Sequence, residues 1–407
     1  MAETPSPWRR DFPQLRADTG LHYLDSAATS LKPDAVLETC TRVMGSEYGP
    51  IHRGLYPAAE RATDAYEGAR TSLSAFLGAG PDDLLIFTRS ATESINVVAA
   101  GWLEPRLQAG DEVWVSAMEH HANYLPWQRA CARSGARLRV LPLSGAEGFD
   151  LEAMPPLTPA VKMIALTAVS NVLGEALPIA TVCERARAVG ARVLVDAAQA
   201  VGHQATDFAH MGCDFLVASG HKMLGPTGVG VLLGRSALLD QIEPVLVGGG
   251  MVDQATLPEP EWAALPARLE AGSPNLVGAV GMAAAAQYLE SAGRQAVAEH
   301  VRQLSQRART ALASIEGVTV YGVESPSGGH GIVSFNLQGV HPHDVGQIAG
   351  EQGVAVRAGH HCCQPLMQAL GVDATARASF ALYNDTSDVE ALVAAVASVK
   401  DLFGSEQ

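Results

Sequence analysis

The chain contains 407 residues, of which 47% are hydrophobic, enough to bury a large core in about two or three domains. Acidic residues outnumber basic ones by 43 to 28, and the net charge of −15 argues against a nucleic-acid-binding surface. The charged N-terminal segment lacks the apolar run of a secretory signal or a membrane anchor, so we expect a cytoplasmic protein with no membrane partner.

Short apolar runs alternate with helical patterns over the first part of the chain. We predict strands at 84–87, 113–116, 138–143, 163–168, 193–195, 215–218 and 229–233. Amphipathic helices at 125–132 and 180–189 carry arginines on their outer faces. This alternation predicts an α/β fold with a mostly parallel seven-stranded sheet, an antiparallel last strand and helices on both faces.

The regular pattern stops at 245–274, where the glycines at 248–250 and several prolines predict a long irregular segment, a flap or a subunit contact. Helices are expected at 277–291 and 294–315, followed by shorter strands near Val318, Ile332, Val354 and Ala378. This order predicts a smaller α+β domain. We therefore expect a large domain at 31–290, a small domain at 291–407 and an N-terminal arm, 1–30, that packs on the small domain.

Asp196 and Lys222 each follow a short apolar run, which places them at the ends of neighbouring strands. A lysine just past a buried strand can condense with an aldehyde cofactor, and an aspartate beside it can keep a pyridine nitrogen protonated. Taken singly, Asp196 could cap a helix and Lys222 could be a solvated lysine. Gln199 and the rigid turn at 225–230 favour the cofactor interpretation, with pyridoxal phosphate as the cofactor.

Two further segments reach the same edge of the predicted sheet. Residues 89–96 follow a strand and open a helical pattern, so the amides and hydroxyls near Thr92 form a candidate phosphate site, or else an ordinary helix cap. His120 follows the strand at 113–116 and can stack on a planar ring while exchanging a proton. A metal ligand or a core histidine is the alternative.

Residues 357–365 place Cys362 and Cys363 beside histidines and Arg357. These neighbours favour thiolates, and the spacing lacks the separated pairs of a zinc site, so we expect a nucleophile or a redox pair and no metal. The six cysteines of the chain are otherwise scattered, and no disulfide framework is expected. Arg377 enters a short apolar strand, where it can clamp a carboxylate or form an ordinary ion pair.

Together these segments resemble the cysteine desulfurase and selenocysteine lyase family. That family belongs to the fold-type I pyridoxal phosphate enzymes, is class V aminotransferase-like, and includes cysteine sulfinate desulfinases. The match spans nearly the whole chain and rests on residues 23–28, 119–123, 170–174, 219–230, 270–275 and 357–365. A series of motifs in this order is far more specific than any one of them.

The resemblance implies roles for the cofactor-binding residues. Lys222 would bind the cofactor covalently, Asp196 would pair with the pyridinium nitrogen, and Gln199 would donate to the ring hydroxyl. His120 would stack on the ring. The phosphate would be held by Thr92, Ser219 and His221, by the backbone of Ala91, and by the partner subunit's Ser273, which implies a homodimer.

The resemblance also implies how a substrate is held. Asn171 would lie between the ring and the substrate, and Arg377 would bind the substrate carboxylate. Cys362 would attack the substrate sulfur. Arg357 and His52 are expected near the substrate pocket.

The implied reaction converts L-cysteine into L-alanine and leaves a persulfide on Cys362, which an acceptor protein collects for a use such as iron–sulfur cluster assembly. The loop before Cys362 looks short, as in enzymes whose basal rate the acceptor stimulates. The alternatives are a selenocysteine lyase, a cysteine sulfinate desulfinase and a non-catalytic sulfur- or metal-binding scaffold. Cys363 stands where the family often has a small residue, and its role stays open between a persulfide relay, a vicinal disulfide and none.

Overall fold

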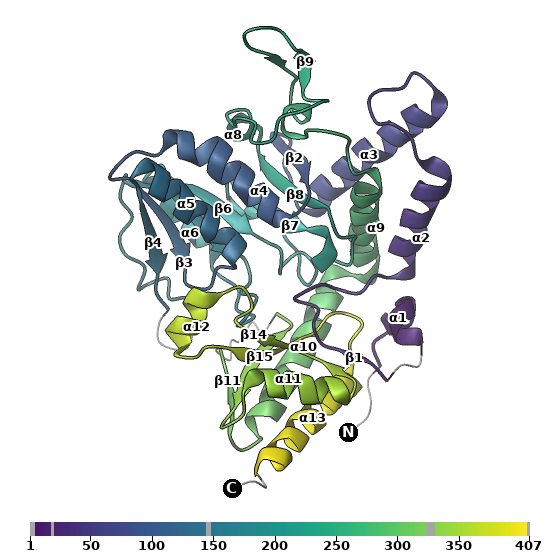
Figure 1. Ribbon diagram of the computed structural model, residues 1–407, viewed down its shortest axis with the longest axis vertical. Coiled ribbons are helices and arrows are strands. Elements are labelled where there is room, and N and C mark those ends of the chain that lie inside the picture. Colours follow the sequence, from purple (N-terminus) through teal and green to yellow (C-terminus); the bar gives the residue numbers. More distant parts are fainter. Residues whose placement is uncertain (1–4, 18–19, 144–147, 323–329, 405–407) are drawn as a thin grey trace.

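The computed structural model describes residues 5–17, 20–143, 148–322 and 330–404 (Figure 1). Its large sheet has seven strands in the order β2-β8-β7-β6-β5-β3-β4. Strand β8 is antiparallel to β2 and β7, and the other neighbouring strands are parallel, so the predicted strands and the antiparallel last strand are confirmed. Their bounds are β2 (Asp83–Thr88), β3 (Glu112–Ser116), β4 (Arg137–Leu141), β5 (Val161–Thr167), β6 (Arg192–Asp196), β7 (Phe215–Ser219) and β8 (Gly230–Arg235).

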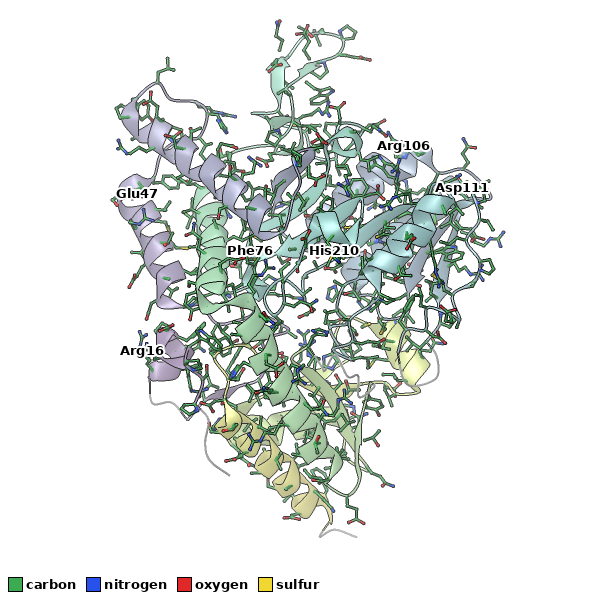
Figure 2. The ribbon with its side chains drawn as sticks, turned by 180° about the vertical axis from the view of Figure 1, so that it is seen from behind. Arg16, Glu47, Phe76, Arg106, Asp111 and His210 are labelled. Atoms are coloured by element: carbon green, nitrogen blue, oxygen red, sulfur yellow. The ribbon has the colours of Figure 1, made fainter. Side chains whose placement is uncertain are left out.

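Helices cover both faces of this sheet, and the predicted α/β architecture is confirmed. Along β6, Val193 and Val195 face one apolar cluster and Leu194 faces another, because successive side chains of a strand alternate between faces. Seen from behind (Figure 2), Glu47 and Arg106 lie on opposite sides of the large unit. The first cluster includes side chains of α3 (Pro57–Phe76), α6 (Ile179–Ala188) and α9 (Leu276–Ala292), and the second those of α4 (Ala91–Val97) and α5 (Leu125–Ser134).

The C-terminal part forms a smaller α+β unit around an antiparallel sheet of order β11-β12-β15-β14. The expected strand at Val354 exists but pairs with β1 outside this sheet. The strands are β1 (His22–Tyr23), β11 (Val318–Val320), β12 (Ile332–Leu337), β13 (Val354–Ala355), β14 (Arg357–Gly359) and β15 (Thr375–Ser379). The helices of this unit are α10 (Arg294–Ala313), α11 (Pro342–Glu351), α12 (Gln364–Leu370) and α13 (Thr386–Gly404).

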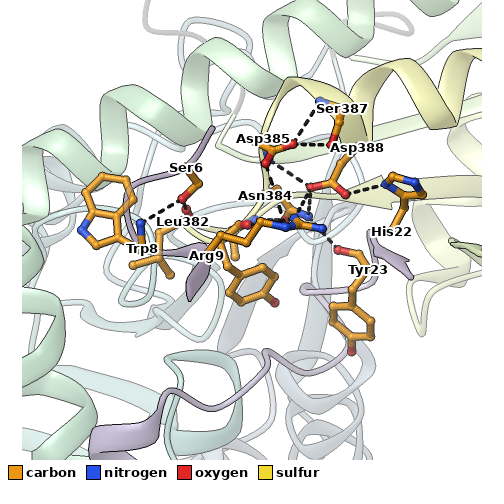
Figure 3. Close-up of polar contacts among 12 residues, drawn as sticks. Ser6, Trp8, Arg9, His22, Tyr23, Leu382, Asn384, Asp385, Ser387 and Asp388 are labelled. Atoms are coloured by element: carbon orange, nitrogen blue, oxygen red, sulfur yellow. Dashed lines mark hydrogen bonds and ion pairs between the residues drawn. The ribbon is translucent and has the colours of Figure 1, made fainter. Parts of the chain in front are cut away.

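The N-terminal arm lies against this small unit (Figure 3). Strand β1 runs parallel to β13, and the buried carboxylate of Asp388 is contacted by Arg9 Nη1 and by His22 Nδ1, each at 2.8 Å. Ser6 Oγ donates to the carbonyl of Leu382. The remaining α-helices are α1 (Pro13–Arg16), α2 (Asp34–Arg42), α7 (Phe208–Met211) and α8 (Ser236–Leu239).

The segment at 245–274 projects from the top of the molecule in Figure 1. The sequence predicts an irregular segment here, but the segment contains an antiparallel hairpin of β9 (Val252–Gln254) and β10 (Glu261–Trp262). Strands this short have no alternation that a sequence could reveal. Val247 and Leu257 on this segment are 70% and 96% exposed. Among the described residues, no helix is both long and apolar enough to cross a bilayer.

Candidate active site

The carboxyl ends of β3, β5, β6 and β7 meet at one edge of the large sheet because these strands are parallel. The loop after β14 lies over this edge, and a cavity of about 200 Å³ lies between them. Most of the predicted site residues line it: Ala91, Thr92, His120, Asn171, Asp196, Ser219, His221, Lys222, Arg357, Cys362 and Arg377.

Asp196 and Lys222 reach this cavity from the ends of adjacent strands. Burial lowers the pKa of the Lys222 amine to about 8, although the Asp196 carboxylate raises it. Burial raises the pKa of Asp196, and its Oδ1 accepts a hydrogen bond from Ala198 N at 3.0 Å. Within the described residues nothing donates to its Oδ2, and no ion pair joins it to Lys222. Both groups therefore remain available to a molecule bound between them.

Two neutral imidazoles flank these groups. Burial, together with the positive charge of Lys222, lowers the pKa of His120 to about 3 and that of His221 to about 4. The Nδ1 atom of His120 accepts from Ala122 N at 3.1 Å, which leaves the proton of the neutral ring on Nε2. A neutral ring can stack on a planar group without adding charge to the cavity.

The opposite end of the cavity lies at the start of α4. Ala91 N donates to Ser219 Oγ at 2.9 Å, so the backbone amide that was expected to hold a phosphate already has a partner. The hydroxyl of Thr92 has no hydrogen bond within the described part of the chain. Gly230 lets strand β8 pass close to the backbone of Ser90, because a Cβ at this position would lie 2.6 Å from that backbone.

Cys362 lies in the short loop at 360–363, between β14 and α12. His361 and Cys362 have φ angles of 51° and 55°, the left-handed region that costs a non-glycine residue about 1 kcal/mol or more. The loop is held in this shape because His121 N donates to the Cys362 carbonyl at 2.7 Å and Asn171 Nδ2 donates to the His361 carbonyl at 2.9 Å. The thiol is thereby kept at the cavity wall.

Arg377 is buried on β15 and faces the same cavity. Its Nη1 donates to the Asn171 carbonyl at 2.8 Å and its Nη2 donates to Asp25 Oδ1 at 3.2 Å, while its buried Nε has no partner among the described residues. Burial lowers the pKa of Arg377 to about 10 and Asp25 raises it, so the guanidinium stays charged at neutral pH. A fixed guanidinium with an unused N–H is suited to binding an anionic group.

Comparison with known proteins shows which family this chain belongs to. The family described as aminotransferase class-V matches residues 22–392. The chain belongs to this family. A probable cysteine desulfurase of Halalkalibacterium halodurans is 44% identical over 97% of both chains.

Two solved structures agree with that assignment, and the resemblance inferred from the sequence is confirmed. The cysteine desulfurase CsdA (S-sulfonic acid) from Escherichia coli has a TM-score of 0.90 and 40% identity, covering 99% of this chain and 100% of that one. The apo cysteine desulfurase from Thermococcus onnurineus NA1 has a TM-score of 0.92 and 35% identity, covering 98% and 99%.

The cofactor of the protein is pyridoxal 5′-phosphate. The cavity fits this group because Lys222 offers an amine for its aldehyde and Asp196 a free carboxylate oxygen for its ring nitrogen. The oppositely charged side chains of Lys222 and Asp196 lie apart in this cavity, which leaves room for the cofactor ring between them. The Thr92 hydroxyl and the neutral His120 ring complete the surroundings.

Three predicted residues do not line the cavity of their own chain. Gln199 is buried beside it, and its Nε2 donates to the Ala27 carbonyl at 2.9 Å. His52 lies in a separate hollow, where its Nε2 contacts Glu67 Oε1 at 3.1 Å, so the expectation that it lies near the substrate pocket does not hold within one chain. Ser273 lines another hollow, of about 400 Å³.

Sequence reasoning missed two residues that shape the site. Asp25, in the motif at 23–28, accepts a hydrogen bond from Arg377. The only sequence signal for this role was the presence of an acidic residue in that motif. Glu119 had no assigned role, yet its carboxylate accepts hydrogen bonds from Ser116, Asn123 and Thr167 and so joins β3 to β5. No group of three or more metal-ligating side chains was found in the described ranges.

Cys363 differs sharply from its neighbour Cys362. It is fully buried, burial raises the pKa of its thiol, and its Sγ donates to the Glu119 carbonyl at 3.2 Å. All the cysteines are free thiols. Because Cys363 does not line the cavity, its contacts favour a packing role over a persulfide relay.

Proposed function

We propose that the protein converts L-cysteine into L-alanine and a persulfide on Cys362. One observation carries the proposal: Lys222, Asp196, Arg377 and Cys362 line one cavity in a chain related to cysteine desulfurases. Each group meets a separate requirement of the reaction, namely cofactor attachment, electron withdrawal, carboxylate binding and sulfur acceptance.

Arg377 binds the substrate carboxylate through the part of its guanidinium that is not already used. Asn171 and Asp25 fix the plane of the guanidinium before a substrate arrives, which removes the need to order it on binding. Arg357 lies directly opposite Arg377 in the β14–β15 pair and adds positive charge to the same wall. An anionic amino acid carboxylate is therefore favoured at this end of the cavity.

When bound, pyridoxal phosphate supplies an electron sink that makes the α-proton of the substrate acidic. Asp196 would keep the ring nitrogen protonated through its free carboxylate oxygen. Lys222 would hold the cofactor through its amine and would take the α-proton of the substrate, since its lowered pKa leaves part of the amine neutral near pH 7. His120 would cover the ring as a neutral imidazole and exclude water from it.

Cys362 takes the sulfur atom of the substrate by attacking that atom directly. Cys362 reacts as the thiolate, and its Sγ forms a bond to the substrate sulfur while the bond between that sulfur and the β-carbon breaks. The electron pair stays on the β-carbon, which takes up a proton and becomes the methyl group of alanine. Cys362 keeps the sulfur as a persulfide.

A second protein must collect this sulfur. Cys362 belongs to a loop of residues 360–363 that is held by His121 and Asn171, so it cannot travel far from the cavity. We therefore propose an acceptor protein that approaches the cavity and stimulates a low basal rate. Unchanged turnover with saturating amounts of a matched acceptor would disprove this step.

The decisive test is alanine production from cysteine by the purified, cofactor-reconstituted protein. Mass spectrometry of the peptide that contains Cys362 should show the added mass of one sulfur atom. A protein that stays colourless after reconstitution, or that forms alanine with no sulfur on Cys362, would refute the proposal. Rates on cysteine, selenocysteine and cysteine sulfinate, measured with and without Cys362, separate the related reactions, because the last two substrates depend less on a thiol nucleophile.

We also propose a homodimer in which Ser273 reaches the cofactor phosphate of the partner subunit. The proposal is supported by a group of exposed apolar side chains on the segments near Ser273 and His52, which is unusual for a monomer. Its members are Met44, Tyr48, Leu55, Tyr56, Val245, Leu246, Val247, Leu257 and Trp262.

The division into an arm at 1–30, a large domain at 31–290 and a small domain at 291–407 is likewise a proposal. It is supported by the contacts of Arg9 and His22 with Asp388 and by the packing of α10 in the small core. A cytoplasmic location is supported by the free thiols of the six cysteines.

A further inference from the structure

The carbonyl oxygen of His221, the residue before Lys222, is approached by four donors. The amide and the hydroxyl of Ser30 each lie 2.9 Å from it, and Thr29 Oγ1 and Lys32 Nζ each lie 3.2 Å from it. A carbonyl oxygen has two lone pairs, so two donors would already satisfy it. Residues 29–32, here called the carbonyl clamp, therefore hold this peptide from several directions.

Lys32 is the charged member of the carbonyl clamp. Its Nζ also donates to the Ser30 carbonyl, and no carboxylate of the described residues contributes to its titration. Burial lowers the pKa of Lys32 to about 8. A partly buried ammonium with only carbonyl partners is less stable than an apolar side chain of similar length would be. Its hydrogen bonds, and not its packing, explain its position.

The carbonyl clamp is itself fixed on both sides. Leu31 N donates to the hydroxyl of Tyr383 at 3.2 Å, which ties the clamp to the small unit. Ser30 Oγ accepts from Leu224 N at 2.8 Å. Leu224 has a φ of 69°, a left-handed conformation that costs about 1 kcal/mol or more outside glycine. The turn that carries Lys222 is thus held in a strained shape by the clamp.

We propose that Lys32 is a positioning residue for Lys222. By holding the His221 carbonyl, it fixes the peptide from which the Lys222 side chain leaves the backbone, and so the direction in which the amine meets the cofactor aldehyde. Lys32 does not line the cavity, so it touches neither cofactor nor substrate. The inference rests on the proposed role of Lys222 as the lysine that binds the cofactor.

Three variants test this inference. Lys32→Met removes the ammonium and keeps the length of the side chain, whereas Lys32→Arg keeps a charged donor. Lys400→Met is the matched control, because Lys400 lies on α13 and pairs with Glu316 at the surface. Two signals report the position of Lys222 without measuring turnover: the rate at which apoprotein takes up pyridoxal phosphate, and the visible circular dichroism of the bound cofactor.

For Lys32→Met we expect cofactor uptake to slow by about tenfold and the dichroic band to change in shape, because small displacements of a reacting group are costly. Lys32→Arg should recover much of both signals, and Lys400→Met should match the unmodified protein. Wild-type values for both signals in Lys32→Met would overturn the inference, even with a lowered Tm, since that pattern describes a purely structural residue.

A folding failure of Lys32→Met would not block the test. Ser30→Ala removes another donor to the same carbonyl and should shift the same two signals in the same direction, and its failure to do so would also overturn the inference. If the unmodified protein took up no cofactor, the role of Lys222 and the proposed function would fall, and this inference with them. The two failures are therefore distinguishable.

Discussion

At the scale of single residues, the site consists of side chains that each keep one polar group unused. Asp196 keeps a carboxylate oxygen, Arg377 keeps its Nε and Lys222 keeps its amine. Polar groups inside proteins are otherwise nearly always paired. Unused groups of both charges on side chains that line one cavity favour a polar ligand with complementary charges.

The pH dependence of cofactor uptake follows from Lys222. Burial lowers the pKa of its amine to about 8, opposed by Asp196. Only the neutral amine attacks an aldehyde, so the uptake rate of apoprotein should rise about tenfold per pH unit below that value and level off above it. Absorbance-detected uptake across neutral pH measures this profile. A rate that is flat or falls with rising pH would contradict it, and Lys222→Ala should give no signal.

The two adjacent cysteines should respond differently to substitution. Cys362→Ala should abolish desulfuration of cysteine, because it removes the thiol at the cavity wall. Cys363→Ala should keep most of the activity and lower the free energy of unfolding by about 1 kcal/mol, because it leaves a small void in the core. Alanine production and urea denaturation measure the two effects. Our assignment of the nucleophile is wrong if Cys363→Ala alone abolishes activity.

At the scale of elements, the sequence could predict what a local pattern determines. The central strands of the large sheet are nearly continuous apolar runs because both of their faces are buried, and Asp196 and His120 could be placed from the ends of such runs. Strands β1 and β13 have two residues each and exist only by pairing across the chain. The contact of Asp25 with Arg377 was equally out of reach, because it joins residues 352 positions apart.

A buried ion pair ties α3 to the segment that carries Ser273. Arg70 Nη1 lies 2.6 Å from Glu270 Oε1, and Glu270 also accepts from Tyr66 Oη at 2.9 Å and Phe87 N at 2.6 Å. Glu270→Ala removes the acceptor of Tyr66 Oη and Phe87 N and leaves the buried Arg70 with only Glu67 and the Leu85 carbonyl, so we expect the free energy of unfolding to fall by about 3 kcal/mol. Urea denaturation measures the loss.

The matched control for this pair is Glu152→Ala. Glu152 is 84% exposed and pairs with Arg185 at the surface, so its removal should leave the urea midpoint unchanged. Equal midpoints for the two variants would show that burial adds nothing to the Arg70–Glu270 contact.

At the scale of the whole molecule, Asp388 joins the arm to the small unit (Figure 3). Burial raises the pKa of its carboxyl, but His22, Arg9 and Asn384 together bring it below the usual value. A folded-state pKa below the unfolded value of about 3.9 adds stability above that pH, and this stability is lost as the pH falls through the folded-state pKa. Asp388→Asn should therefore be less stable than the unmodified protein at neutral pH, and the difference should shrink in acid. Thermal unfolding at several pH values measures it, and a difference that grows in acid would contradict the sign.

The proposed dimer makes the strongest prediction about the whole molecule, because a residue that serves the partner's site can be complemented by mixing subunits. Lys222→Ala lacks the amine, and Ser273→Asp places a negative charge where the phosphate is expected, so each should be inactive alone. Random pairing makes about half of the dimers hybrids, and each hybrid has one complete site only if Ser273 acts across the interface. About a quarter of the wild-type activity should then return.

A second mixture is the control for this experiment. Asp196 and Lys222 line the cavity of the same chain, so a mixture of Asp196→Asn with Lys222→Ala contains no complete site and should stay inactive. If the Ser273→Asp mixture also stays inactive although its hybrids form, Ser273 serves its own subunit or no site at all. If both mixtures regain activity, the Asp196 and Lys222 side chains of one active site come from different subunits. Our assignment of both residues to the cavity of the same chain would then be wrong.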